Sequence, residues 1–178
     1  MRGLVRALTP SIFVPYEAPL ERGLLLDRRD RFIATVKLEN KQDVDVHCIN
    51  PGRMEAFVDT TATVWVLPAP EATAETRKLK HSWEAIEQNH AIDDKRIMCG
   101  TNTQRPNKLV RALLEARCLP GLDVWKSLKP EAKFDVTTAD GEQHTGRADF
   151  LLDGDAERKH YIEVKNCHLV YPDGWGYF

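Results

Sequence analysis

The sequence predicts a protein of the α+β or α/β class in which an all-β first part precedes a segment with one clear helix and three strands. Short runs rich in β-branched and aromatic residues recur between turn signals over the first third of the chain. One strongly amphipathic segment, 105–116, follows. After it come apolar runs that carry ionisable residues, among them Asp149 and Glu163. These three observations place a β-domain first and a mixed domain second.

Length and charge limit the classes of protein that the chain can form. With 178 residues, 42% hydrophobic and 29% charged, the chain has a soluble globular composition and suits one ordinary domain or two small ones. The formal net charge of −2 gives no global attraction to a polyanion. Any nucleic-acid binding must therefore use local basic patches.

The cysteines and the amino terminus bear on the cellular compartment. Four widely separated cysteines, without a C-x-x-C pair, predict reduced thiols in a cytoplasmic protein. The uncharged run from Ala7 to Tyr16 is interrupted by Pro10 and Pro15 and is too short to span a bilayer. We therefore expect an amino-terminal arm and no membrane partner.

The first domain is expected to be a compact β-barrel of the OB-like type. Its strands are predicted at residues 24–26, 31–38, 44–49 and 62–67, with a polar hairpin connection at 40–43. The turn Asn50-Pro51-Gly52 leads to Arg53, and turn N–H groups with a guanidinium form a good phosphate seat. Asn50 and Arg53 are therefore candidate nucleic-acid contacts. The alternative is an ordinary surface turn with a solvated arginine.

A proline-containing polar segment that begins at Pro68 is predicted to be a linker. The predicted domains are residues 1–82 and 83–178. Lys78 and Lys80 lie in a basic run beside Trp83, which suits backbone binding and base stacking. A solvated linker face beside a buried Trp83 explains the same pattern.

The clearest helix is predicted over residues 105–116. Thr103 or a neighbour can cap it, Pro106 suits its first turn, and apolar residues form one stripe along it. Arg105 and Lys108 lie toward its amino end, where they can contact phosphates. Basic residues on a solvated helical face are the alternative interpretation.

The last part of the chain is predicted to contain strands at 128–136, 146–152 and 161–165, with a tight turn at Asp140-Gly141. Period-two alternation would place Glu163 and Lys165 on one face of the last strand. If the strand with Asp149 lies beside it, two carboxylates and a lysine share a small volume.

That set of groups suits a metal-and-phosphate site. Mg²⁺, or Mn²⁺ in its place, prefers oxygen ligands such as Asp149, Glu163 and the backbone carbonyl of Val164. Lys165 could orient a water or stabilise charge on a phosphorane-like transition state. Glu131, on the preceding strand, could complete the metal shell. Alternating charges on an exposed strand are the competing explanation.

Several ordered motifs together resemble the sugar fermentation stimulation protein A family over about residues 20 to 178. These motifs are His47 to Met54, Lys80 to Glu84, Asn102-Thr103 with Pro106 to Val110, Ser127 to Glu131, Arg147 to Leu152 and Tyr161 to Asn166. The resemblance implies an OB-like amino-terminal domain followed by a restriction-endonuclease-like PD-(D/E)XK mixed-sheet core. Metal-dependent hydrolysis of DNA or RNA is the activity that it implies.

The family motif carries over onto Asp149, Glu163 and Lys165, and less directly onto Glu131. The resemblance also implies a further helix and strand after the aromatic loop that resembles Tyr171 to Phe178, so the chain is expected to be truncated there. A homodimer is one candidate assembly. The alternative functions are a non-catalytic DNA-binding regulator linked to sugar (maltose) metabolism and a small-molecule phosphate binder or hydrolase.

Overall fold

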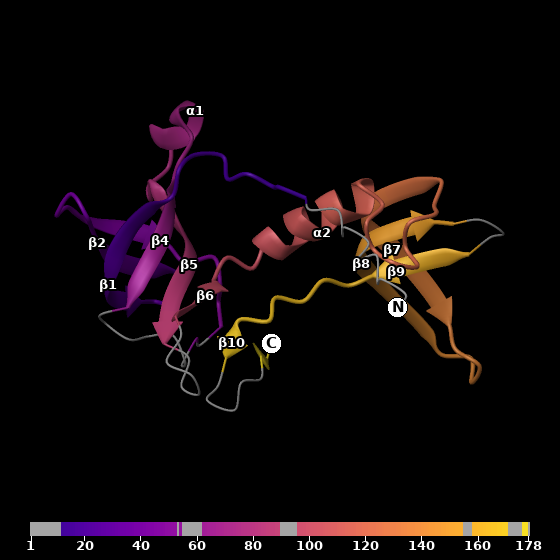
Figure 1. Cartoon of the computed structure of the whole chain (residues 1–178). Coiled ribbons are helices and arrows are strands. Elements are labelled where there is room, and N and C mark those ends of the chain that lie inside the picture. The colour runs from indigo at the N-terminus through magenta and orange to yellow at the C-terminus, as the bar shows by residue number, and fades with distance from the viewer. Residues whose placement is uncertain are drawn as a thin grey trace, which may run out of the picture. The chain divides into compact units, whose positions relative to one another are not determined.

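The computed structural model describes residues 12–52, 54, 62–89, 96–154, 158–170 and 176–177. The chain forms two compact units (Figure 1). Pro15–Pro106 and Lys165–Phe178 belong to the first, which we call the barrel unit, and Asn107–Val164 belong to the second, the sheet unit. Each unit is described separately below.

The barrel unit is built on one antiparallel sheet that closes on itself. Its strands are β1 (Glu21–Arg29), β2 (Ile33–Leu38), β3 (Asp43–His47), β4 (Thr63–Pro68), β5 (His81–Asn89) and β6 (Arg96–Gly100). They pair in the order β3-β2-β1-β4-β5-β6, and a parallel pairing of His47 with Ser82 joins β3 to β5. That contact closes β1 to β5 into a barrel, which leaves fewer strand edges exposed. The predicted OB-like barrel is confirmed.

Alternate side chains of these strands fill the barrel interior. The fully buried apolar residues include Leu25, Val36, Val46, Val64, Val66, Trp83 and Ile86. Because successive strand residues point to opposite faces, the alternation read in the sequence supplies this core. Trp83 is completely buried and its Nε1–H donates to the carbonyl of Ala85 at 3.0 Å. Packing, rather than base stacking, is thus the role that the structure gives Trp83.

Gly23 in β1 lies where the barrel wall has no room for a side chain. A Cβ at this position would stand 2.5 Å from Val36 Cγ1 and 2.7 Å from the Lys37 carbonyl oxygen. We expect Gly23→Ala to lower the free energy of unfolding by about 1–3 kcal/mol, because the neighbouring strand must shift. Gly100→Ala in β6 is the matched control, since its Cβ would have no atom within 4 Å. Equal urea midpoints for the two variants would contradict this prediction.

The segment expected to link two domains instead connects two strands of the barrel. It contains the short helix α1 (Glu71–Ala74) and leads from β4 into β5. The expected boundary at residues 82 and 83 falls inside β5, which pairs with β4 on one side and with β6 on the other. A polar, proline-containing composition is typical of exposed connections, both those between domains and those between strands, so it does not distinguish the two. The units divide between Pro106 and Asn107.

The sheet unit combines one helix with an antiparallel sheet. Its elements are α2 (Arg105–Glu115), which begins at the end of the barrel unit, and β7 (Ser127–Thr137), β8 (Gln143–Asp153) and β9 (Lys159–Ile162). The sheet order is β7-β8-β9 (Figure 1). Leu114 of α2 is buried with Phe150 and Leu152 of β8. The predicted helix and the tight turn are confirmed, and Gly141 has the positive φ of 88° that this turn requires.

Two short strands complete the described secondary structure. The strands β10 (Leu169–Val170) and β11 (Gly176–Tyr177) form a two-stranded antiparallel pair. All four cysteines carry free thiols, as the sequence predicts. Within the described part of the chain, no helix is both long enough and apolar enough to cross a membrane.

Candidate active site

Asp149 lies in β8, the central strand of the sheet unit, between β7 and β9. β8 pairs with β9 through Phe150 and Ile162, so the next register position sets Asp149 against Glu163. On the other side, the β7–β8 register pairs Pro130 with Phe150 and Ala132 with Ala148, so Glu131 and Asp149 lie between two paired positions. Opposite residues of antiparallel strands are close neighbours. The three candidate carboxylates therefore come from neighbouring positions of β7, of β8 and of the residue that follows β9.

The Asp149 carboxylate is held by two hydrogen bonds from different elements. Asn107 Nδ2 of α2 donates to Oδ1 at 2.8 Å, and the backbone N–H of Val164 donates to Oδ2 at 2.6 Å. In the second bond the Val164 N–H donates to a side chain instead of to a main-chain carbonyl of the neighbouring strand. β9 accordingly ends at Ile162. The strand predicted over 161–165 is too long, and Glu163 and Lys165 follow it as exposed residues.

Glu131 does not join Asp149 in a cluster of ligands. Its backbone has a positive φ of 51°, and its Oε2 lies 3.3 Å from Arg147 Nη1 in an exposed ion pair. Among the described residues, no three histidine, cysteine, aspartate or glutamate side chains are grouped closely enough to hold a metal ion. The carboxylate cluster that Glu131 was expected to complete is thus not formed by the described side chains.

The residues predicted to contact nucleic acid have different environments. Asn50 is only 2% exposed, and its Oδ1 accepts the Gly52 N–H at 2.8 Å, so it organises the turn from within. Lys78 and Lys80 are exposed on the barrel unit, and Lys108 is exposed on α2. Arg53 lies outside the described residues.

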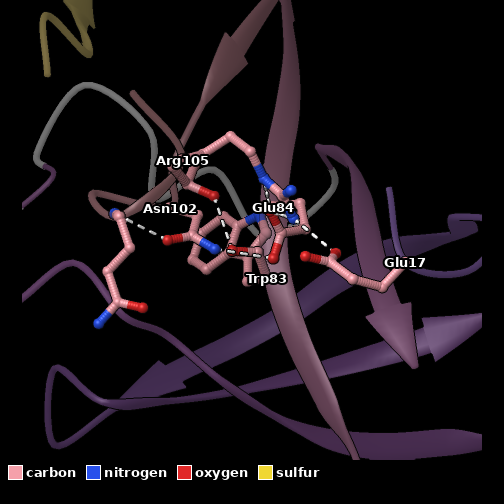
Figure 2. Close-up of polar contacts among 7 residues, drawn as sticks. Glu17, Trp83, Glu84, Asn102 and Arg105 are labelled. Atoms are coloured by element: carbon pink, nitrogen blue, oxygen red, sulfur yellow. Dashed lines mark hydrogen bonds and ion pairs between the residues drawn. The ribbon is translucent and has the colours of Figure 1, made fainter. Parts of the chain in front are cut away.

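Arg105, also predicted to contact phosphate, is engaged inside the barrel unit (Figure 2). Its Nε and Nη2 lie 3.2 and 3.1 Å from Oε2 of Glu84, a residue of β5 that is 2% exposed. Asn102 Nδ2 donates to Glu84 Oε1 at 2.8 Å. Glu17 lies 3.3 Å from Arg105 Nη2, and the Tyr16 ring lies under the guanidinium. We call these five residues the Arg105 cluster.

Electrostatics within the Arg105 cluster favour the charged form of Arg105. Burial opposes the positive charge on Arg105, but the charges and hydrogen bonds of Glu84 and Glu17 together outweigh burial and raise the pKa of Arg105. Burial, followed by the charge of Glu84, raises the pKa of Tyr16. The guanidinium therefore has two carboxylate partners, and a phosphate would have to displace one of them.

Comparison with known families identifies both units. The family model described as the SfsA N-terminal OB domain matches residues 26–98, and the model described as the sugar fermentation stimulation protein RE domain matches residues 104–178. The chain belongs to the sugar fermentation stimulation protein (SfsA) family. The first SfsA model spans most of the barrel strands, and the second begins one residue before α2.

Individual SfsA relatives agree with this membership. A sugar fermentation stimulation protein homolog of Caulobacter vibrioides is 34% identical over 160 residues, which cover 90% of this chain and 60% of the relative. One from Synechococcus elongatus is 38% identical over 148 residues, covering 83% of this chain and 56% of the relative. The chain thus spans about three fifths of the length of these curated relatives.

A solved structure supports the fold. The structure of Pyrococcus furiosus SfsA in complex with Ca²⁺ superposes with a TM-score of 0.63 at 17% sequence identity. The match covers 86% of this chain and 57% of that chain. At this level of identity, the similarity concerns the fold.

One residue of the candidate site in this SfsA-family chain is absent from the site residues predicted from the sequence. Asn107 fixes the Asp149 carboxylate, yet it lies outside the acidic and lysine pattern. Helical spacing contains a signal, because Asn107, Val110 and Leu114 are three and then four residues apart and share one face. Leu114 is fully buried and Val110 packs on the same core. A polar residue on that apolar face indicates a specific hydrogen-bond partner.

Proposed function

We propose that this SfsA-family protein is a metal-dependent nuclease that hydrolyses phosphodiester bonds of DNA or RNA. The observation that supports this proposal most is the Asp149 carboxylate, held in one orientation by Asn107 and Val164 with Glu163 at the next register position. A rigidly held carboxylate on a central strand is suited to hold a cation against a substrate phosphate.

The donor set fits a hard divalent cation. An ionised carboxylate offers about four lone-pair sites, and each Asp149 oxygen uses one of them for a hydrogen bond. The Glu163 carboxylate and the Val164 carbonyl would supply further oxygen ligands for Mg²⁺ or Mn²⁺. The Ca²⁺ in the complex of Pyrococcus furiosus SfsA is a cation with the same preference for oxygen.

Each residue has a defined part in the proposed reaction. A bound divalent ion would supply Lewis acidity and a bound water that ionises near neutral pH. Asn107 and the Val164 N–H keep Asp149 oriented, and Lys165 places an ammonium two residues after Glu163, where it can offset negative charge on the phosphate. Glu131 can exchange Arg147 for the cation, because an exposed ion pair contributes only about 0–1 kcal/mol.

The proposed substrate follows from the barrel as well as from the site. OB-type barrels bind oligonucleotides on a sheet face and its loops, and the exposed Lys78 and Lys80 would add phosphate contacts. Lys108 would do so at the amino end of α2. Because Arg105 is occupied by Glu84 and Glu17, we leave it out of the proposed contacts.

A panel of metals and substrates tests the nuclease proposal. Purified chain is incubated with single- and double-stranded DNA and with RNA, in Mg²⁺, Mn²⁺, Ca²⁺ or EDTA. We expect cleavage in Mg²⁺ or Mn²⁺ that Glu163→Ala abolishes and that Glu142→Ala retains, since Glu142 is an exposed carboxylate in the β7–β8 turn. Equal cleavage by the wild type and Glu163→Ala would overturn the proposal. Salt-sensitive binding without cleavage in any metal would favour the non-catalytic regulator.

A further inference from the structure

The turn that leads into α2 is hydrogen-bonded to the main chain of β5. The Thr101 N–H donates to the carbonyl oxygen of Glu84 at 2.9 Å, and the Thr101 hydroxyl donates to the carbonyl oxygen of Trp83 at 3.2 Å. Thr101 is only 1% exposed, so these bonds are shielded from water. The chain therefore enters α2 from a fixed point on β5.

One buried carboxylate organises the start of α2. Glu84 Oε1 accepts a hydrogen bond from Asn102 Nδ2, and Glu84 Oε2 accepts from Nε and Nη2 of Arg105 (Figure 2). Asn102 Oδ1 in turn accepts the Gln104 N–H at 2.9 Å, and the Asn102 carbonyl oxygen accepts the Arg105 N–H at 3.1 Å. N–H groups at a helix start have no acceptor within the helix and need such partners. Glu84 thus holds both the residue that satisfies these N–H groups and the first residue of α2.

Asn107 lies in the first turn of the same helix, two residues after Arg105. Its Nδ2 donates to Asp149 Oδ1 at 2.8 Å. Because a hydrogen bond weakens steeply with distance and angle, the position of the Asn107 main chain decides whether this bond forms. Helix ends fray where their N–H groups lose their partners. Fraying of the first turn would therefore move the Asn107 amide away from Asp149.

We infer that Glu84 and Arg105 are positioning residues of the candidate active site. They hold the first turn of α2, and with it the Asn107 amide that orients Asp149. The inference rests on the proposed function for its effect on cleavage, although not for its effect on Asn107. The Glu84 side chain is 1% exposed and the Arg105 side chain is 12% exposed, so this role requires no contact with substrate. Loss of the pair should lower the turnover of bound substrate and leave substrate binding unchanged.

Arg105→Lys tests this role, because Glu84→Ala is expected to lower stability too far. Lysine keeps the charge but cannot offer two nitrogens of a planar guanidinium to the carboxylate. We expect kcat in Mg²⁺ to fall about three- to tenfold with KM unchanged, a smaller loss than that of Asn107→Ala. In the Asn107→Ala background the same change should cost less than about twofold, because both act through one hydrogen bond. Arg111→Lys is the matched control, since Arg111 forms an exposed pair with Glu115 further along α2 and should leave kcat and KM unchanged.

The side-chain amide signals of Asn107 in the ¹⁵N-labelled chain, recorded in EDTA, report the same link without cleavage. We expect them to shift in Arg105→Lys and not in Arg111→Lys, with urea midpoints showing that both variants are folded. Unshifted signals in Arg105→Lys, a raised KM with unchanged kcat, or an equal fall in kcat in both backgrounds would overturn the inference. Shifted signals in a chain that cleaves nothing in any metal leave the positioning role standing and remove the nuclease proposal, and cleavage with unshifted signals does the reverse.

Discussion

Asp149→Asn is expected to abolish metal-dependent cleavage while the chain remains folded. The substitution removes the negative charge and leaves one oxygen where two accept hydrogen bonds, from Asn107 and from the Val164 N–H. The NH₂ group of the new asparagine must then face one of these two donors, which loses its acceptor. The site then loses both a cation ligand and the orientation of Val164. Single-turnover cleavage at saturating Mg²⁺ measures the loss.

Asn107→Ala separates the ligand from the residue that orients it. This variant keeps the Asp149 carboxylate and its bond from Val164, so we expect a loss of about 10–100-fold, as for other residues that orient metal ligands. Asp149→Asn should lose more than that. Asp135→Asn, an exposed carboxylate of β7, is the control for charge alone. Cleavage by Asp149→Asn within tenfold of Asp135→Asn would show that Asp149 is not a ligand.

Local sequence patterns predict the helices, strands and turns whose formation depends on residues that are adjacent in sequence. The barrel strands, the 105–116 helix and the turn at Gly141 follow from alternation, helical spacing and turn chemistry. The closure of the barrel depends instead on a parallel contact between His47 and Ser82. No local rule reports such a pairing, and the predicted boundary therefore falls inside β5.

The candidate site shows the same division between local and long-range information. The sequence pattern indicates that Asp149 and Glu163 lie near each other, because both lie in or beside short apolar strands. It cannot show that the Asp149 side chain ends β9 by accepting the Val164 N–H. Arg105 is predicted from the sequence to contact phosphate. That prediction overlooks its acidic partner, Glu84, because Glu84 lies on another element. Charge position in the sequence does not reveal which charges are already paired.

Glu84→Ala is expected to destabilise the barrel unit by about 3 kcal/mol or more, because it leaves Arg105 buried without its main partner. The Arg105 side chain is 12% exposed, and Asn102, which is 7% exposed, also loses its acceptor. Only Glu17 then offsets the effect of burial on the guanidinium, and the pKa of Arg105 falls. Urea unfolding followed by the fluorescence of the buried Trp83, next to Glu84 in β5, reports this change.

Glu17→Ala provides the matched control within the Arg105 cluster. Glu17 contacts the same nitrogen of Arg105, but its side chain is 42% exposed, so its removal should cost no more than about 1 kcal/mol. The difference between the two glutamates reports the burial of Glu84 together with the additional hydrogen bonds that Glu84 accepts from Arg105 Nε and Asn102 Nδ2. Equal unfolding midpoints for Glu84→Ala and Glu17→Ala would contradict the prediction and would reopen Arg105 as a phosphate contact.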